Sequence, residues 1–224
     1  MGKIEAVIRE HLPDTYVYSV QLAPSDSEDQ KAGFFGNVNM QVDTVCEQLR
    51  NDEHLKDGFN AIGFSQGGQF LRQGAYAGYV RDHVVQAQYY KDWQNLEAYL
   101  KNNIFLPDIN NELPAKNSTY AKHLQRLHTF VMIQFDKDIT VKPAGSAWFD
   151  YYNASGILVP LKDQPLYKED WIGLMALDKQ DRLVFKTCPG AHMQFTLDYF
   201  VEEVLWPYLA DQQASTEKQV VFDI

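Results

Sequence analysis

The segment Gly63-Phe64-Ser65-Gln66-Gly67 is the feature that most constrains this 224-residue chain. It follows a short apolar run at 59–64, expected to be a buried strand, and precedes a stretch at 66–80 that we expect to be helical. A tight strand-to-helix turn needs glycine on either side, where a Cβ would clash, and it holds the serine hydroxyl above the sheet edge. Such a match arises by chance only roughly 0.03 times in a chain of this composition. We therefore interpret Ser65 as a candidate nucleophile rather than an ordinary serine in a glycine-rich turn.

Strands and helices alternate on both sides of this turn, which predicts a parallel α/β sheet. The expected strands are 16–22, 59–64, 129–135 and 182–187. Besides 66–80, the expected helices are an opening helix that Pro13 ends, and the stretches 38–50, 82–101, 118–127 and 194–208. The polar stretch 25–30 is expected to be a loop, and the tail 211–224 to be loose. Four core strands are few for a catalytic sheet of this type, so the sheet is expected to be incomplete.

A serine nucleophile needs a general base, and the base needs a carboxylate that orients it. In sheets of this kind the chain order is serine, acid, histidine. His192 lies in the loop after the last expected strand, whereas the other five histidines lie on expected helices or at their ends. Asp136 and Asp138 both follow the strand 129–135, and the residues alone leave both open as the acid.

Composition excludes several classes of function. The formal net charge of −10 argues against nucleic acid or an anionic membrane as the main partner. Two cysteines allow no disulfide framework and no cysteine-based zinc site, and no metal or cofactor is required for the expected chemistry. No apolar run is long enough for a transmembrane anchor, and the start of the chain shows no signal peptide.

Several segments together resemble the lysosomal palmitoyl-protein thioesterases, over nearly the whole chain up to about Ala210. The resemblance is carried by residues 35–39 (FGNVN), 60–72 (NAIGFSQGGQFLR), 85–89 (VQAQY), 104–110 (IFLPDIN), 130–132 (FVM), 146–149 (SAWF) and 183–185 (LVF), and by His192. The combination is highly specific.

This resemblance implies an α/β-hydrolase-like parallel sheet with a helical cap, in a single domain over 1–210 whose cap or insert region is 82–128. It implies Ser65 as nucleophile, His192 as base and Asp138 rather than Asp136 as acid, with the backbone N–H of Gln66 as one oxyanion donor. Within the cap, Tyr89, Trp93 and Tyr99 are candidates for an acyl-binding groove, although core packing is the better expectation for each.

The resemblance also exposes two gaps. Family members begin with a signal peptide and a first core strand ending in a loop that supplies a second oxyanion N–H, and this chain starts at the helix after it. A further segment containing a central strand is lacking after Arg72. That deletion removes the cysteine that would pair with Cys46, so Cys46 is expected to be free.

The expected function is serine thioesterase action on long-chain acyl thioesters, with S-acylated proteins or peptides as partners. Two alternatives stay open: a catalytically inert relative that binds acyl chains or protein, and a general carboxyl-ester lipase on the same fold. Two sequons, at Asn117 and Asn153, fit a glycoprotein of the lysosome or the secretory route.

Overall fold

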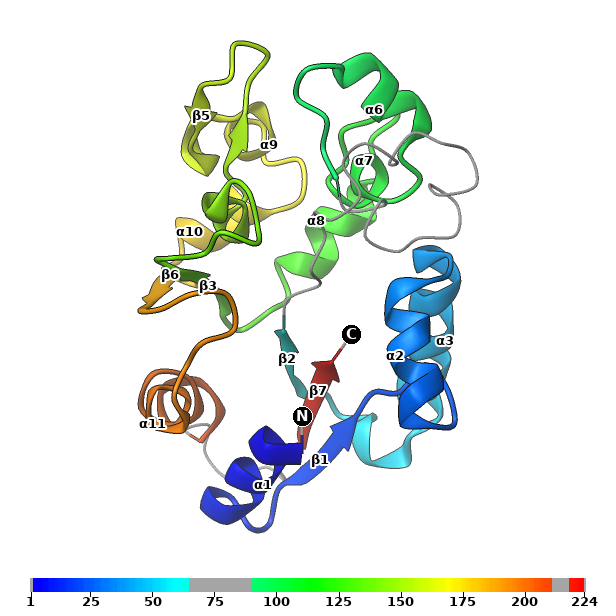
Figure 1. Ribbon diagram of the computed structural model, residues 1–224, viewed down its shortest axis with the longest axis vertical. Coiled ribbons are helices and arrows are strands. Elements are labelled where there is room, and N and C mark those ends of the chain that lie inside the picture. Colours follow the sequence, from blue (N-terminus) through cyan, green and yellow to red (C-terminus); the bar gives the residue numbers. More distant parts are fainter. Residues whose placement is uncertain (1, 65–89, 211–217, 224) are drawn as a thin grey trace. The chain divides into compact units, whose positions relative to one another are not determined.

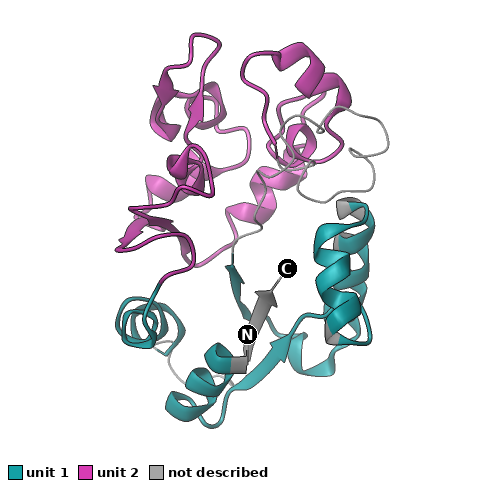
Figure 2. Cartoon of the chain, viewed as in Figure 1, with its two compact units in different colours: residues 1–66, 195–224 teal, residues 67–194 magenta. Residues whose placement is uncertain are grey.

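The computed structural model describes residues 2–64, 90–210 and 218–223. The chain divides into two compact units (Figure 2). Unit 1 comprises residues 1–66 and 195–224, so it is built from both ends of the chain, and unit 2 comprises residues 67–194. Expectations of a single domain over 1–210 and of a cap over 82–128 stay predictions.

Unit 1 combines helices with a three-stranded sheet (Figure 1). Its elements are α1 (Gly2–His11), β1 (Tyr16–Ser19), α2 (Asp26–Phe34), α3 (Val38–Asn51), η1 (Glu53–Leu55), β2 (Asn60–Phe64), α11 (Leu197–Phe200), η4 (Val201–Leu209) and β7 (Lys218–Asp223). The expected opening helix, the helix 38–50 and two of the expected strands are confirmed with small shifts of their ends.

The sheet of unit 1 has the order β1-β7-β2, and both neighbours run parallel to β7. Val220 of β7 is opposite Tyr18 on one side and Ala61 on the other. The expectation of a loose tail is therefore wrong for residues 218–223. Their apolar centre, Val220-Val221-Phe222, suits a strand that has a neighbour on each side.

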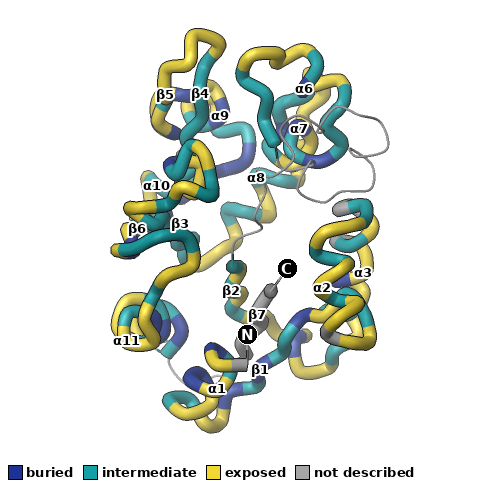
Figure 3. Tube along the Cα trace, in the orientation of Figure 1, coloured by how far each residue is buried: buried dark blue, intermediate teal, exposed yellow. Residues whose placement is uncertain are grey.

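The main core of unit 1 lies against α1. Its apolar positions Ile4, Val7 and Ile8 have helical spacing and are all buried (Figure 3). They form one cluster with Val17 of β1 and with side chains from α11 and η4, namely Phe200, Leu205 and Leu209. This cluster ties the two ends of the chain into one unit.

Two expectations about the helices of unit 1 need correction: the place of one and the start of another. The stretch 25–30, expected to be a loop, belongs mostly to α2. The closing helix begins at Leu197 rather than 194, and η4 has π-helical spacing, with the Ala210 N–H donating to the carbonyl of Leu205. Pro207 lies inside η4, where a residue without an N–H interrupts regular α-helical bonding.

Unit 2 holds two parallel strands, a short hairpin and several short helices. Its elements are α6 (Leu96–Asn102), α7 (Leu106–Ile109), α8 (Ser118–Leu124), β3 (Phe130–Phe135), η2 (Ala144–Trp148), β4 (Tyr151–Tyr152), β5 (Leu158–Val159), η3 (Leu161–Asp163), α9 (Pro165–Lys168), α10 (Leu174–Asp178) and β6 (Leu183–Cys188). The expected strands at 129–135 and 182–187 and the helix near 118–127 are confirmed.

Strands β3 and β6 pair in parallel from Phe130 opposite Leu183 to Phe135 opposite Cys188. The core of unit 2 lies beside this pair. It consists of Met132, Leu161, Leu166, Ile172, Leu174, Leu177 and Leu183. Because both strands end together, the loops that follow them begin at the same sheet edge.

The expected helix over 82–101 is wrong for residues 90–95, and residues 82–89 lie outside the described ranges. Helix α6 begins at Leu96, because the side chain of Asn95 accepts a hydrogen bond from the N–H of Ala98 and caps it. Asp92 likewise accepts from the N–H of Gln94. These local hydrogen bonds compete with helical ones and stop the aromatic periodicity from becoming one long helix.

The described part of the chain thus belongs to the α/β class, with parallel strands and helices in each unit. The four expected strands form two sheets rather than one, β7 lies within the first, and β4 and β5 form a separate antiparallel pair. Within the described residues, no helix has both the length and the apolar character that a membrane span requires.

Candidate functional site

The structure describes the segment before the expected nucleophile turn only up to Phe64. Strand β2 ends at Phe64, directly before Ser65, as the sequence predicted. Ser65 and Gln66 themselves lie outside the described residues, as does Tyr89. Their expected roles therefore stay predictions.

The expected acid and base lie side by side in unit 2. Nδ1 of His192 is 2.7 Å from Oδ2 of Asp138, and the two side chains are 18% and 7% exposed. Asp138 follows β3 and His192 follows β6, so the parallel pairing of the strands brings these distant residues to one sheet edge. The ring of His192 also meets the Phe135 ring edge-on, with centroids 6.0 Å apart.

The carboxylate of Asp138 is fixed by its own turn. Oδ1 accepts hydrogen bonds from the N–H groups of Thr140 and Val141, at 2.8 and 2.9 Å. Burial raises the pKa of the Asp138 carboxyl, but the hydrogen bonds from Val141, His192 and Thr140 together outweigh it, so that this pKa lies below its usual value. Asp138 is therefore ionised at neutral pH and available to orient an imidazole.

This geometry can support base catalysis. A carboxylate that accepts from Nδ1–H fixes the tautomer of His192 and leaves Nε2 to take a proton from a nucleophile. The same carboxylate stabilises the imidazolium that then forms. The pair has the geometry that the acid and base of a serine-hydrolase triad require, and its action together with Ser65 stays a prediction.

Asp136 has a different partner from Asp138. Its Oδ1 accepts a hydrogen bond of 2.7 Å from the N–H of Gly190, two residues before His192. The sequence left Asp136 and Asp138 as alternatives, and the structure brings Asp138 alone of the two onto the histidine ring. No pattern in the sequence predicted the contact of Asp136 with Gly190.

The described groove candidates pack within unit 2. Tyr99 is fully buried, with the Lys91 ammonium 5.6 Å from its ring, as expected for a core side chain. The Trp93 ring lies 5.8 Å from that of Tyr152 in β4 and borders Gly156 in the following turn. A role of these side chains in acyl binding remains a prediction.

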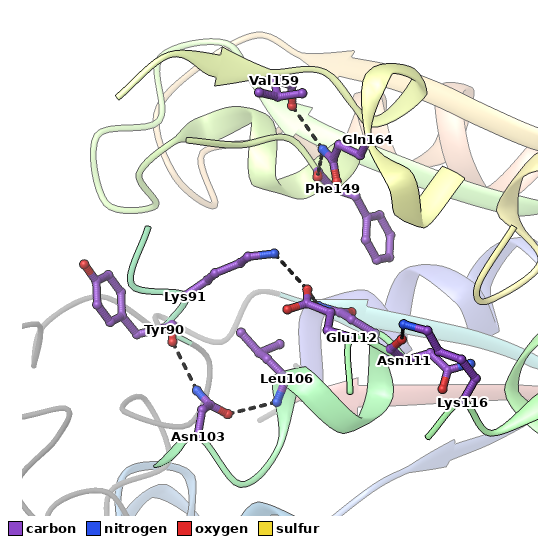
Figure 4. A network of polar contacts seen from close by, with 11 residues as sticks. Tyr90, Lys91, Asn103, Leu106, Asn111, Glu112, Lys116, Phe149, Val159 and Gln164 are labelled. Atoms are coloured by element: carbon purple, nitrogen blue, oxygen red, sulfur yellow. Dashed lines mark hydrogen bonds and ion pairs between the residues drawn. The ribbon is translucent and has the colours of Figure 1, made fainter. Parts of the chain in front are cut away.

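Sequence reasoning missed a network of polar contacts in unit 2 (Figure 4), one member of which, Lys91, lies beside Tyr99. Lys91 forms an ion pair of 2.8 Å with Glu112, whose side chain is only 7% exposed. The Lys91 ammonium also lies 4.3 Å from the ring centre of Tyr151. Asn103 donates to the carbonyl of Tyr90 and accepts from Leu106 N–H. Isolated polar residues carry no periodic signal, so nothing in the sequence pattern indicates such contacts.

Both sequon asparagines lie at turns. Asn117 is exposed and caps α8, and its Oδ1 accepts from both the N–H and the hydroxyl of Thr119. Asn153 lies in the hairpin between β4 and β5, where its Oδ1 accepts from the N–H groups of Ser155 and Ile157.

Neither a disulfide nor a metal cluster is found among the described residues. Cys46 is exposed and Cys188 is buried, and the two form no disulfide, as expected for Cys46. Within residues 2–64, 90–210 and 218–223, no three histidine, cysteine, aspartate or glutamate side chains are arranged to hold a metal ion.

Comparison with known proteins finds relatives that match most of this chain. The chain is 34% identical to palmitoyl-protein thioesterase 1 of Caenorhabditis elegans over an alignment of 255 residues, which covers 93% of this chain and 85% of the relative. It is 30% identical to palmitoyl-protein thioesterase 3 of Dictyostelium discoideum, with coverage of 94% and 85%. A lysosomal thioesterase PPT2 homolog of Drosophila melanogaster is 33% identical over 58% of this chain and 46% of its own length.

The family match itself is interrupted at one point. The family model described as palmitoyl protein thioesterase matches residues 1–75 and 73–192 as two segments, which overlap at residues 73–75. The first alignment, at 255 residues, is longer than the 224 residues of the chain, so the relative has residues for which this chain has no counterpart. With matches over most of its length, including Asp138 and His192, the chain belongs to the palmitoyl protein thioesterase family.

Proposed function

We propose that this protein is a serine thioesterase that removes long-chain fatty acyl groups, such as palmitoyl, from cysteine thioesters of proteins or peptides. The 2.7 Å contact between His192 and Asp138 carries the proposal, because it supplies an oriented base in a chain of this family. The α/β-hydrolase fold, with a single domain over 1–210 and a cap over 82–128, is part of the proposal.

The proposed reaction proceeds through an acyl-enzyme. Oγ of Ser65 attacks the thioester carbonyl while Nε2 of His192 takes its proton, and the resulting tetrahedral oxyanion accepts a hydrogen bond from the N–H of Gln66. The C–S bond then breaks, and the imidazolium returns its proton to the thiolate sulfur. Water, deprotonated by His192, attacks the acyl-enzyme and releases the fatty acid and the serine hydroxyl.

The direct test is palmitoyl-thioester hydrolysis by the purified chain beside its Ser65→Ala variant. Turnover that is lost in the variant is the expected result, because alanine has no nucleophile. Unchanged turnover in Ser65→Ala would refute the assignment. A thioesterase and a general carboxyl-ester lipase pass through the same kind of intermediate, so the catalytic residues do not distinguish them. Comparing rates on a thioester and an oxyester with the same acyl chain does.

An inert relative is the competing candidate. The family match in two segments favours it, since the chain has no counterpart for part of a relative's sequence. Such a protein would bind acyl chains or protein without turnover. It predicts no labelling of Ser65 by a serine-directed phosphonate, whereas stoichiometric labelling that is lost in His192→Ala would exclude it.

We further propose a lysosomal or secretory location with glycans at Asn117 and Asn153. Relatives named lysosomal thioesterases and the surface turns that hold both sequons support this. In cells of the source organism, Asn117→Gln and Asn153→Gln should each increase electrophoretic mobility by the mass of one glycan. Mobility that glycosidase treatment leaves unchanged in the wild type would contradict it.

A further inference from the structure

The loop that carries His192 is attached to the end of β3 by three hydrogen bonds. The N–H of Asp136 donates to the carbonyl of Cys188 at 3.1 Å, and the N–H of Lys137 donates to that of Gly190 at 3.0 Å. The carboxylate of Asp136 accepts the third from the N–H of Gly190, at 2.7 Å. The first two continue the backbone pairing of β3 with β6, while the third depends on one side chain.

The same loop has a positive φ on both sides of His192. Gly190 has φ of +127° and Met193 has φ of +59°. A Cβ at Gly190 would lie 2.7 Å from the carbonyl oxygen of Gln194, so the loop also folds tightly on itself. For a residue with a side chain, such as Met193, this region is sparsely populated and persists only where the surroundings hold it. The short hydrogen bond from the Gly190 N–H to the Asp136 carboxylate is one side-chain contact that supplies this support, beside the contact of His192 with Asp138.

We propose that Asp136 is a positioning residue for the catalytic histidine, a role that rests on the function proposed above. Its carboxylate holds the N–H of Gly190, and thereby fixes the loop so that the His192 ring stays against Asp138. The two carboxylates have different roles: Asp138 orients the His192 ring, and Asp136 orients the backbone of the loop that carries His192.

Steady-state kinetics of the full chain on a palmitoyl thioester test this role. Asp136→Ala should lower kcat by about 10- to 100-fold with KM changed less than about 2-fold, because a misplaced base affects chemistry rather than binding. Asp136→Asn, which keeps an acceptor oxygen, should restore most of kcat. Asp163→Ala removes a 68% exposed carboxylate from the same unit and serves as the control.

Proton–nitrogen NMR of the His192 imidazole gives a readout that does not need turnover. In the wild type and in Asp163→Ala, the Nδ1–H resonance should lie downfield and exchange slowly. In Asp136→Ala it should broaden or shift toward that of a free imidazole, while circular dichroism stays that of a folded chain.

The outcomes separate this role from the proposed function. An inactive wild type whose imidazole resonance depends on Asp136 refutes the thioesterase and leaves the positioning role standing. An active wild type matched by Asp136→Ala in kcat and in imidazole spectrum overturns the positioning role alone. Loss of the folded state in both Asp136→Ala and Asp136→Asn also overturns it, because the residue would then support the fold and not the base.

Discussion

Asp136 and Asp138 lie two residues apart after β3, yet one accepts from a backbone N–H and the other from an imidazole. Residue type does not decide between these partners, since both are short carboxylates at the same sheet edge. The register of β3 against β6 decides, because it sets which part of the histidine loop each carboxylate meets: the N–H of Gly190 or the ring of His192. A change at either residue should consequently have its own kinetic signature.

Replacement of Asp138 tests the orientation of the base. Asp138→Asn keeps the size of the side chain but allows its amide to favour the wrong tautomer of His192. We expect kcat to fall by about 10³–10⁴-fold with KM little changed, the size of effect this substitution has in serine-hydrolase triads. Asp163→Asn should leave kcat unchanged, and a fall of less than about 5-fold in Asp138→Asn would contradict the assigned role.

The lowered pKa of Asp138 also makes a prediction about stability and pH. A carboxyl whose pKa is lower in the folded chain than the ordinary value of about 3.9 stabilises the fold fully above that value. That contribution is lost as pH falls through the lower, folded-state pKa. Urea unfolding of wild type and Asp138→Asn should therefore give different free energies of unfolding at pH 5, and the difference should shrink as the pH is lowered further into acid. A difference that grows in acid would reverse the sign of the shift.

Part of the site could be predicted from sequence alone. Chain order and the loop after the last strand were enough to select His192 and to restrict the acid to two aspartates. The contact of Asp136 with Gly190, by contrast, depends on strand register and a positive φ, and neither leaves a periodic trace in the sequence.

Among the elements of unit 2, α7 and α8 are joined through one buried amide. Asn111 is 4% exposed and has φ of +57°. Its amide donates to the carbonyls of Asn117 and Trp171, and its Oδ1 accepts from the N–H of Asn117. Asparagine suits this position because it tolerates the left-handed region and bonds on both sides of its amide.

Substitutions of Asn111 should show how much this junction contributes. Asn111→Ala removes three hydrogen bonds and strains the backbone, and we expect it to lower the free energy of unfolding by about 3 kcal/mol. Asn111→Gly loses the same bonds without the strain and should be about 1 kcal/mol less harmful. Urea denaturation measures both, and an alanine variant within 0.5 kcal/mol of wild type would show that α8 is held by other contacts.

The ion pair of Lys91 and Glu112 fastens the segment before α6 to the residues after α7. Removing one partner leaves the other charge partly buried, so Lys91→Met and Glu112→Gln should each cost about 1–3 kcal/mol. The double variant should cost less than the two added together, because it leaves no unpaired charge. A double-mutant cycle by urea denaturation measures this coupling, and strict additivity would argue that the pair contributes nothing.

Elements with an apolar period were predictable, and those without one were not. Helices α1 and α3 and strands β2, β3 and β6 carry their pattern in the sequence. In α2 the local contacts are polar, with Ser25 donating to Glu28 and Asp29 accepting from two backbone N–H groups at 22–23. Strand β7 was missed because its partners lie at the opposite end of the chain.

At the scale of the whole molecule, unit 1 depends on β7. Strands β1 and β2 both pair with it and not with each other. Deletion of residues 211–224 should leave two unpaired parallel strands, which expose their edges and lose protection of their amides. Hydrogen exchange followed by mass spectrometry should show this loss at 16–19 and 60–64, with the amides of β3 and β6 as internal control. Unchanged protection in β1 would refute the sheet order.

The position of β7 also sets the order in which the chain can fold during its synthesis. Domains fold as their residues emerge from the ribosome, the N-terminal parts first. Here the middle strand of the first sheet is made after every other described element, so β1 and β2 leave the ribosome with no strand between them. Residues 67–194 are contiguous and complete before that moment. Unit 1 therefore cannot complete its sheet until unit 2 has been synthesised. A nascent chain interrupted before residue 218 would expose the unpaired edges of β1 and β2, to which a chaperone could bind.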